Sequence, residues 1–187
     1  MPFLVSGHRV NATAHYKGNA ASFRFGINIL CFLFVVLFCA TPCIGAEFSE
    51  RVIGTLDGDT IEVLHNQRAE RIRLQGIDCP EKRQAYGNKA KHAASALVFG
   101  KEVTLQTHGK DKYKRTLADV LLPDGTNVNH ALVKDGWCWW YRKYAPEDTD
   151  LERLEQEARE ARKGLWADPH PIPLWEWRKG KQGGKEE

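Results

Sequence analysis

The sequence lacks the features that mark several classes of protein. It has no internal repeat, no Cys and His cluster with the spacing of a zinc site, and no long apolar run after residue 46. Its seven histidines are scattered, so none is assigned a catalytic role. The 42% hydrophobic and 27% charged residues are ordinary for a globular domain. Wholesale disorder, collagen and a polytopic membrane protein are therefore excluded.

Residues 47–187 also lack a net charge. The formal charge of the whole chain is +3, but residues 1–46 hold three basic residues and no Asp or Glu. The rest of the chain therefore carries 24 basic residues against 24 acidic ones. Between residues 71 and 115, however, eleven Lys and Arg stand against four acids. This imbalance predicts a local basic cleft whose binding to a polyanion is sensitive to salt.

The one long apolar run lies near the start of the chain. Residues 27–40 are apolar except for Asn28, Arg24 precedes them, and small residues follow. This pattern predicts a signal peptide over residues 1–46, cleaved after Gly45 or Ala46, and hence a secreted or periplasmic protein. The alternative is an uncleaved membrane anchor that leaves the protein facing outward. A spanning helix needs about 20 apolar residues, and Pro42 interrupts this run.

Two of the five cysteines, Cys79 and Cys138, lie outside the predicted signal peptide. In an oxidising compartment two such cysteines can form a disulfide. They can equally be two small buried hydrophobic residues. The sequence leaves both alternatives open.

Hydrophobic patterning divides the rest of the chain into short strands and three helices. Alternation of apolar and polar residues predicts strands over residues 51–57, 60–64, 71–77, 101–107 and 116–122. Apolar residues at three- and four-residue spacing predict helices over residues 88–99, 128–134 and 147–163. Five strands with a helix after the third, then two more helices, are typical of an OB-fold barrel, an α+β fold. We expect residues 47–168 to form this domain.

The C-terminal residues 169–187 are expected to lie outside this domain. Pro169, Pro171 and Pro173 predict an extended run that ends at residues 175–177. The Gly- and Lys-rich residues 179–187 predict a disordered basic tail.

Three segments contain the candidate site: DGDT at 57–60, RLQGIDCPE at 73–81 and DKYKR at 111–115. Taken alone, each is an ordinary turn or a solvated charge run. Together they supply two carboxylates, Asp59 and Asp78, that could converge on a hard cation such as Ca²⁺. The backbone carbonyl of Cys79 is a further candidate ligand.

The same segments supply groups for hydrolysis of a phosphodiester. Glu81, three residues after Asp78, could orient or deprotonate a water held by the metal. Arg73 and Arg115 are permanently charged and suited to bidentate contacts with phosphate. Their N–H groups would stabilise the negative charge that develops on the phosphate oxygens in the transition state.

These segments, with DKYKRTLA at 111–118 and VNHALVKDG at 128–136, resemble the thermonuclease (staphylococcal-nuclease-like) family over residues 51–166. The resemblance implies an OB-fold, calcium-dependent nuclease that acts on DNA and RNA and leaves 3′-phosphate ends. It implies Arg73, Glu81 and Arg115 as catalytic residues, and Asp59, Asp78 and the carbonyl of Cys79 as Ca²⁺ ligands. It further implies that Asp57 polarises a metal-bound water and that Lys112, Tyr113, and Tyr144 or Tyr141 contact the nucleotide.

Two positions depart from the family pattern. Cys79 replaces a Thr at the metal site, where only the backbone oxygen is needed, and Lys114 replaces a Gly before Arg115. The resemblance implies no protein partner, and we expect a monomer. Two alternatives stay open: an OB-fold protein that binds nucleic acid without cleaving it, and a nuclease anchored at the membrane.

Overall fold

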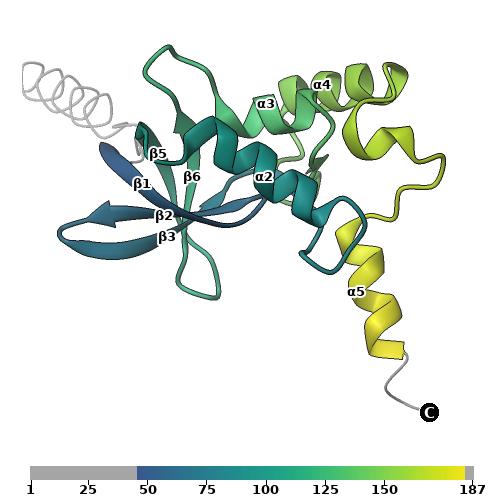
Figure 1. Ribbon diagram of the computed structural model, residues 1–187, viewed down its shortest axis with the longest axis horizontal. Coiled ribbons are helices and arrows are strands. Elements are labelled where there is room, and N and C mark those ends of the chain that lie inside the picture. The colour runs from purple at the N-terminus through teal and green to yellow at the C-terminus, as the bar shows by residue number, and fades with distance from the viewer. Residues whose placement is uncertain (1–45, 184–187) are drawn as a thin grey trace, which may run out of the picture. The chain divides into compact units, whose positions relative to one another are not determined.

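The computed structural model describes residues 46–183, which contain a closed five-stranded β-barrel (Figure 1). The strands follow the order β1-β2-β3-β6-β5, and β1 pairs with β5 to close the barrel. All neighbouring strands are antiparallel except β3 and β6, which are parallel. The predicted α+β barrel of the OB type is confirmed. The barrel strands are β1 (Glu47–Asp57), β2 (Thr60–His65), β3 (Arg68–Leu74), β5 (Glu102–Lys110) and β6 (Thr116–Leu121).

The core of the barrel follows from the alternation of apolar residues along each strand. In β6, buried and partly buried residues alternate over all six positions. Every second side chain therefore enters the interior, where it meets the inward residues of the other strands. The barrel core consists of Val52, Ile61, Val63, Ile72, Leu74, Val103, Leu105, Ala118 and Val120, each at most 1% exposed.

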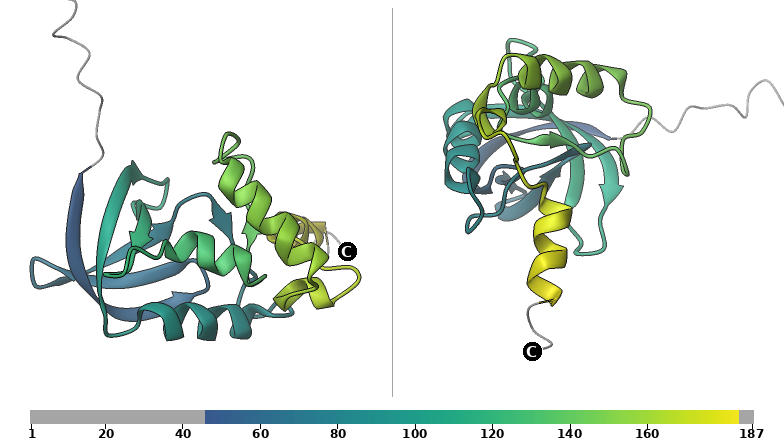
Figure 2. Two further views of the ribbon diagram at one scale, coloured as in Figure 1. Left: turned by 90° about the horizontal axis from the view of Figure 1, so that it is seen from above. Right: turned by 90° about the vertical axis from the view of Figure 1, so that its right-hand side faces the viewer.

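Three helices form where the sequence predicted helices, and two of them pack directly on the barrel strands. Figure 2 shows α3 (Val128–Lys134) between α2 (Gly87–Val98) and α4 (Thr149–Glu160). The small residues Ala90 and Ala94 are fully buried and bring α2 close to the barrel. The chain then forms a short 3-10 helix, η1 (Gly164–Ala167).

The predicted third strand is divided in two. β3 ends at Leu74, and Gly76 at φ 73° turns the chain into β4 (Ile77–Asp78). β4 pairs antiparallel with β7 (Trp139–Trp140), outside the barrel. This break matters for the site because it carries Asp78 away from β3 and fixes it against a second segment.

The C-terminal segment differs from its prediction. Residues 174–183 form a fourth helix, α5 (Leu174–Gly183), where the prediction was an extended run followed by disorder from residue 179. The helix begins directly after Pro173, a residue that suits a helix start because its fixed φ is already helical. Leu174 is 2% exposed, so packing adds to the stability of a helix that is too short to be stable by itself.

The structure decides between the two alternatives for Cys79 and Cys138, a disulfide or two separate buried residues. Cys79 and Cys138 form a disulfide between residues 59 positions apart. The predicted signal peptide lies outside the described residues, apart from Ala46. Within residues 46–183, no helix is long and apolar enough to cross a membrane.

Candidate active site

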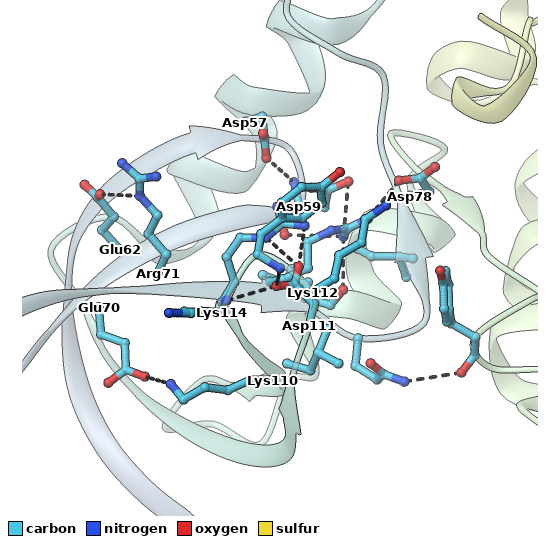
Figure 3. A pocket seen from close by; sticks show the side chains of 18 of the residues that line it. Asp57, Asp59, Glu62, Glu70, Arg71, Asp78, Lys110, Asp111, Lys112 and Lys114 are labelled. Atoms are coloured by element: carbon cyan, nitrogen blue, oxygen red, sulfur yellow. Dashed lines mark hydrogen bonds and ion pairs between the residues drawn. The ribbon is translucent and has the colours of Figure 1, made fainter. Parts of the chain in front are cut away.

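One open cleft of about 2020 Å³ brings most of the predicted site residues together (Figure 3). The three predicted catalytic residues line it, although they come from β3, the loop before α2 and the start of β6. Cys79 is 2% exposed and takes part through its backbone. The other predicted site residues that line the cleft are Asp57, Asp59, Asp78, Lys112, Tyr113, Tyr141 and Tyr144.

A tight hairpin holds Asp57 and Asp59 at one wall of the cleft. β1 ends at Asp57 and β2 starts at Thr60, so only Gly58 and Asp59 form the turn. A Cβ on Gly58 would lie 2.8 Å from Cβ of Cys79 and 3.0 Å from that of Ala90. The glycine is therefore needed for this close approach. It places the hairpin directly against the loop that follows Asp78.

Arg73 forms ion pairs with both carboxylates that are predicted to bind the metal, those of Asp59 and Asp78. Its Nη2 donates to Oδ1 of Asp78 at 2.8 Å, and its Nη1 lies 3.2 Å from Oδ2 of Asp59. Asp59 Oδ2 also accepts the backbone N–H of Cys79 at 2.8 Å. In the pairing of β2 with β3, Arg73 is opposite Thr60, the residue that follows Asp59. This register explains why the side chains of Arg73 and Asp59 meet.

The carboxylates of this cluster are crowded and buried. Burial, followed by the nearby charge of Asp59, raises the pKa of Asp57 to about 6. The same two causes, in the same order, raise the pKa of Asp78 to about 7, against the opposing effect of Arg73. The cluster therefore holds more negative charge than Arg73 alone stabilises, and a further cation would relieve it.

The donor chemistry of this cluster suits a hard cation. Its potential ligands are carboxylate oxygens and a backbone carbonyl, which is what Ca²⁺ takes, with water to complete six to eight ligands. A carboxylate has about four acceptor sites, so the hydrogen bonds to Asp59 leave capacity for a metal. Within residues 46–183, no group of three or more His, Cys, Asp or Glu side chains is arranged to hold a metal ion. A cation here would thus depend on two carboxylates, the carbonyl of Cys79 and water.

Arg115 is held in place by Asp111, a residue whose role the sequence did not predict. Asp111 Oδ1 accepts the backbone N–H groups of Tyr113 and Arg115 at 2.8 and 3.0 Å. Its Oδ2 lies 2.7 Å from Nη2 of Arg115. Although burial favours neutral Asp111, these hydrogen bonds hold its pKa below the usual value. Arg115 Nη1 also donates to Thr60 Oγ1 at 3.2 Å, so the loop and the hairpin are linked.

The Lys114 departure from the family pattern has a structural consequence. Lys114 has φ 64°, in the left-handed region that glycine adopts without steric cost. The loop thus keeps the backbone shape that a glycine favours, with a lysine side chain added at the cleft. Figure 3 shows Lys112 and Lys114 beside Asp111, from the same loop.

The predicted tyrosine contacts differ in accessibility. Tyr113 and Tyr144 are 68% and 59% exposed, and a lysine lies over each ring: Lys112 at 5.0 Å and Lys143 at 5.6 Å. The ring of Tyr141 instead stacks on that of Trp175, with centroids 5.5 Å apart and planes at 7°. Of the two alternatives for stacking on a base, Tyr144 is therefore the more accessible.

Glu81 lines the cleft and pairs with Arg178, a residue that the sequence did not indicate as part of the site. Its Oε1 accepts Nε of Arg178, on α5, at 2.9 Å. The two residues are 97 positions apart, and no motif spacing connects them. The pair could have been predicted only from the packing of α5 against the loop that contains Glu81. The sequence predicted an extended run and disorder for that segment instead.

Charge is unevenly distributed over the described part of the chain. The cleft is lined by nine Lys and Arg and seven Asp and Glu, so it carries a positive balance that residues 47–187 as a whole lack. The cleft that contains Arg73 and Arg115 therefore has a small excess of basic residues, in the direction that the sequence predicted. Its cations are Arg68, Arg71, Arg73, Lys110, Lys112, Lys114, Arg115, Lys143 and Arg178.

Comparison with known proteins agrees with this architecture. Residues 71–168 match the family model described as staphylococcal nuclease homologue. The chain is 44% identical over 147 residues to an "Uncharacterized endonuclease" of Escherichia coli O157:H7, covering 79% of this chain and 95% of that protein. It is 40% identical over 157 residues to a "Micrococcal nuclease" of Shigella flexneri, covering 79% and 90%. The chain belongs to the family of staphylococcal nuclease homologues.

Proposed function

We propose that this protein is an exported, calcium-dependent nuclease that hydrolyses phosphodiester bonds of DNA and RNA and leaves 3′-phosphate ends. One observation carries the proposal: Arg73, Glu81 and Arg115 line the same cleft as the carboxylates of Asp59 and Asp78. Relatives named as an endonuclease and a micrococcal nuclease, at 44% and 40% identity, support nuclease chemistry on nucleic acid.

Glu81 acts as the general base in this proposal. Its side chain is 38% exposed, so water can reach it, and it lies in the loop that follows the carboxylate cluster. It accepts the proton of the attacking water as the new bond between oxygen and phosphorus forms. The bond between phosphorus and the 5′ oxygen breaks on the opposite side, the 5′ oxygen takes up a proton from solvent water, and the phosphate stays on the 3′ end.

Arg73 and Arg115 bind the phosphate in this proposal. Arg73 is anchored on the carboxylate cluster, and Arg115 on Asp111 and Thr60. These anchors fix the orientation of both guanidinium groups before substrate arrives, so little reorganisation is needed as charge develops on the phosphate. Simple binding of nucleic acid would need the arginines but has no use for Glu81.

Asp59, Asp78 and the carbonyl of Cys79 are the groups that would hold Ca²⁺. When bound, the ion would supply Lewis-acid polarisation of the phosphate and would lower the pKa of a bound water. The chain contributes a buried oxygen-rich site, with Asp59 and Asp78 at 6% and 2% exposure. Asp57, hydrogen-bonded to the N–H of Asp59 at 3.3 Å, orients the hairpin that presents these groups.

Removal of the metal tests the proposal directly. We expect the protein to cleave single-stranded DNA in CaCl₂ and to stop cleaving it when EDTA is added in excess. The products should carry 3′-phosphate ends, which phosphatase treatment converts to 3′-hydroxyl. Calcium should also raise the melting temperature, because a ligand that binds only the folded state stabilises it.

Each outcome separates the alternatives. Cleavage that persists in EDTA would reject the metal assignment. Binding of single-stranded DNA without cleavage in any divalent ion would favour the OB-fold protein that binds without hydrolysis. Calcium-dependent melting is measured without substrate, so it reports on the metal site even in a protein that does not cleave.

Export is the remaining part of the proposal. It is supported by the apolar run at 27–40 and by the Cys79–Cys138 disulfide, a bond typical of oxidising compartments. N-terminal sequencing of the protein recovered outside the cytoplasm should give Ala46 or Glu47 as the first residue. Recovery of the intact N-terminus in the membrane fraction would instead indicate an anchored nuclease.

A further inference from the structure

Arg178 adds a guanidinium to the cleft from outside the matched family region. It lies on α5, beyond residues 71–168, and it lines the cleft together with Arg73 and Arg115. Figure 1 shows α5 below the loop that precedes α2, the loop that contains Glu81. The contact between Arg178 and Glu81 at 2.9 Å confirms that the two segments meet.

Specific contacts dock α5 in this position. Leu174, in its first turn, is 2% exposed and lines the same cleft as Arg178. Trp175 stacks on Tyr141 and meets the edge of Trp139 with centroids 6.3 Å apart. Just before the helix, the backbone carbonyl of Ile172 accepts the side-chain amide of Gln84.

The helical period then directs Arg178 into the cleft. Residues four apart lie on the same face of a helix, so Arg178 extends one turn beyond the buried Leu174. The neighbouring Lys179 is exposed and does not line the cleft. The helix therefore presents one of these two adjacent cations to the site.

The ion pair between Arg178 and Glu81 is exchangeable. Their side chains are 56% and 38% exposed, and pairs this accessible contribute little to stability because water screens them. A phosphate offers Arg178 a stronger, bidentate partner than a single carboxylate oxygen. Binding of a nucleic-acid strand can thus transfer Arg178 from Glu81 to a phosphate.

We propose that Arg178 is a substrate-binding residue that contacts a backbone phosphate of the nucleic-acid strand, so that α5 forms part of the binding cleft. The proposal rests on the proposed nuclease function, because it assumes that a polynucleotide occupies the cleft. The alternative for the same contact is inhibition, in which Arg178 would restrain Glu81 and lower activity.

Salt-dependent binding tests the proposal. The affinity of the full-length chain for a labelled single-stranded oligonucleotide is measured by fluorescence anisotropy at several salt concentrations, in EDTA to prevent cleavage. Arg178→Ala should weaken binding about tenfold, since a hydrogen bond between charged groups is lost. The slope of log affinity against log salt should fall by about 0.7, the value for one phosphate contact on a single strand. Arg178→Lys should keep the slope.

Lys179→Ala is the matched control, because it removes the same charge from the same helix outside the cleft. It should leave the slope unchanged. Equal effects of Arg178→Ala and Lys179→Ala would overturn the proposal, as would an unchanged slope in Arg178→Ala. Faster cleavage in calcium by Arg178→Ala would overturn it in favour of inhibition. Because binding is measured without cleavage, a protein that binds but never cleaves would reject the proposed function and still test Arg178.

Discussion

Replacement of Glu81 by glutamine is expected to slow the cleavage of single-stranded DNA at least ~10²-fold, the usual contribution of a general base. Glutamine keeps the size of the side chain but cannot take the proton of the attacking water. The backbone here is fixed, since Glu81 O accepts the N–H of Gln84 at 2.8 Å. A Cβ on Gly87 would lie against that same carbonyl, so the start of α2 also holds the loop in place.

The measurement is single-turnover cleavage in saturating CaCl₂, with the melting temperature recorded for each variant. The control is Glu152→Gln, which neutralises an exposed glutamate on α4, a helix that does not line the cleft. Glu81→Gln should lower the cleavage rate with little change in melting temperature, because its ion pair with Arg178 is largely exposed. An unchanged rate in Glu81→Gln would remove it as the base and leave the arginines as binding groups.

The local elements were predictable because their signals lie close together in the sequence. Helix α3 has the predicted bounds, since Asn127 caps it by accepting the N–H of His130 at 3.1 Å. The convergence of Arg73 and Asp59 was predictable for the same reason, because a two-residue turn and a hairpin register determine it.

Features that depend on tertiary contacts were not predictable from sequence. Helix α5 owes its place to Trp175 on Tyr141 and to buried Leu174, contacts between residues far apart in the chain. Glu155 lies on α4, a helix with many acidic residues, yet it is only 4% exposed. It pairs with Arg159, four residues along the same helix, at 3.1 Å, and it also accepts the N–H of Trp140 at 3.2 Å, a tertiary contact that no helical period reveals. Burial raises the pKa of this carboxyl against the opposing effect of Arg159.

Removal of the Cys79–Cys138 disulfide is expected to destabilise the domain by about 2–5 kcal/mol. The bond closes a loop between residues 59 positions apart, so it restricts the unfolded chain strongly. It also adjoins the short pairing of Asp78 with Trp139, which positions the metal carboxylate. The double variant Cys79→Ala/Cys138→Ala avoids a free thiol and keeps the backbone carbonyl of residue 79.

Thermal denaturation with and without a strong reductant separates the stabilising effect of the disulfide from that of the packing of the two cysteine side chains. The double variant should melt roughly 10 °C below the unchanged protein. Reductant should lower the melting temperature of the unchanged protein toward that of the variant, and should leave the variant unaffected. A melting temperature insensitive to reductant would mean that the cysteines act only as buried apolar residues, since both are at most 2% exposed. In that case the position of Asp78 would depend on β7 pairing and on Arg73 alone.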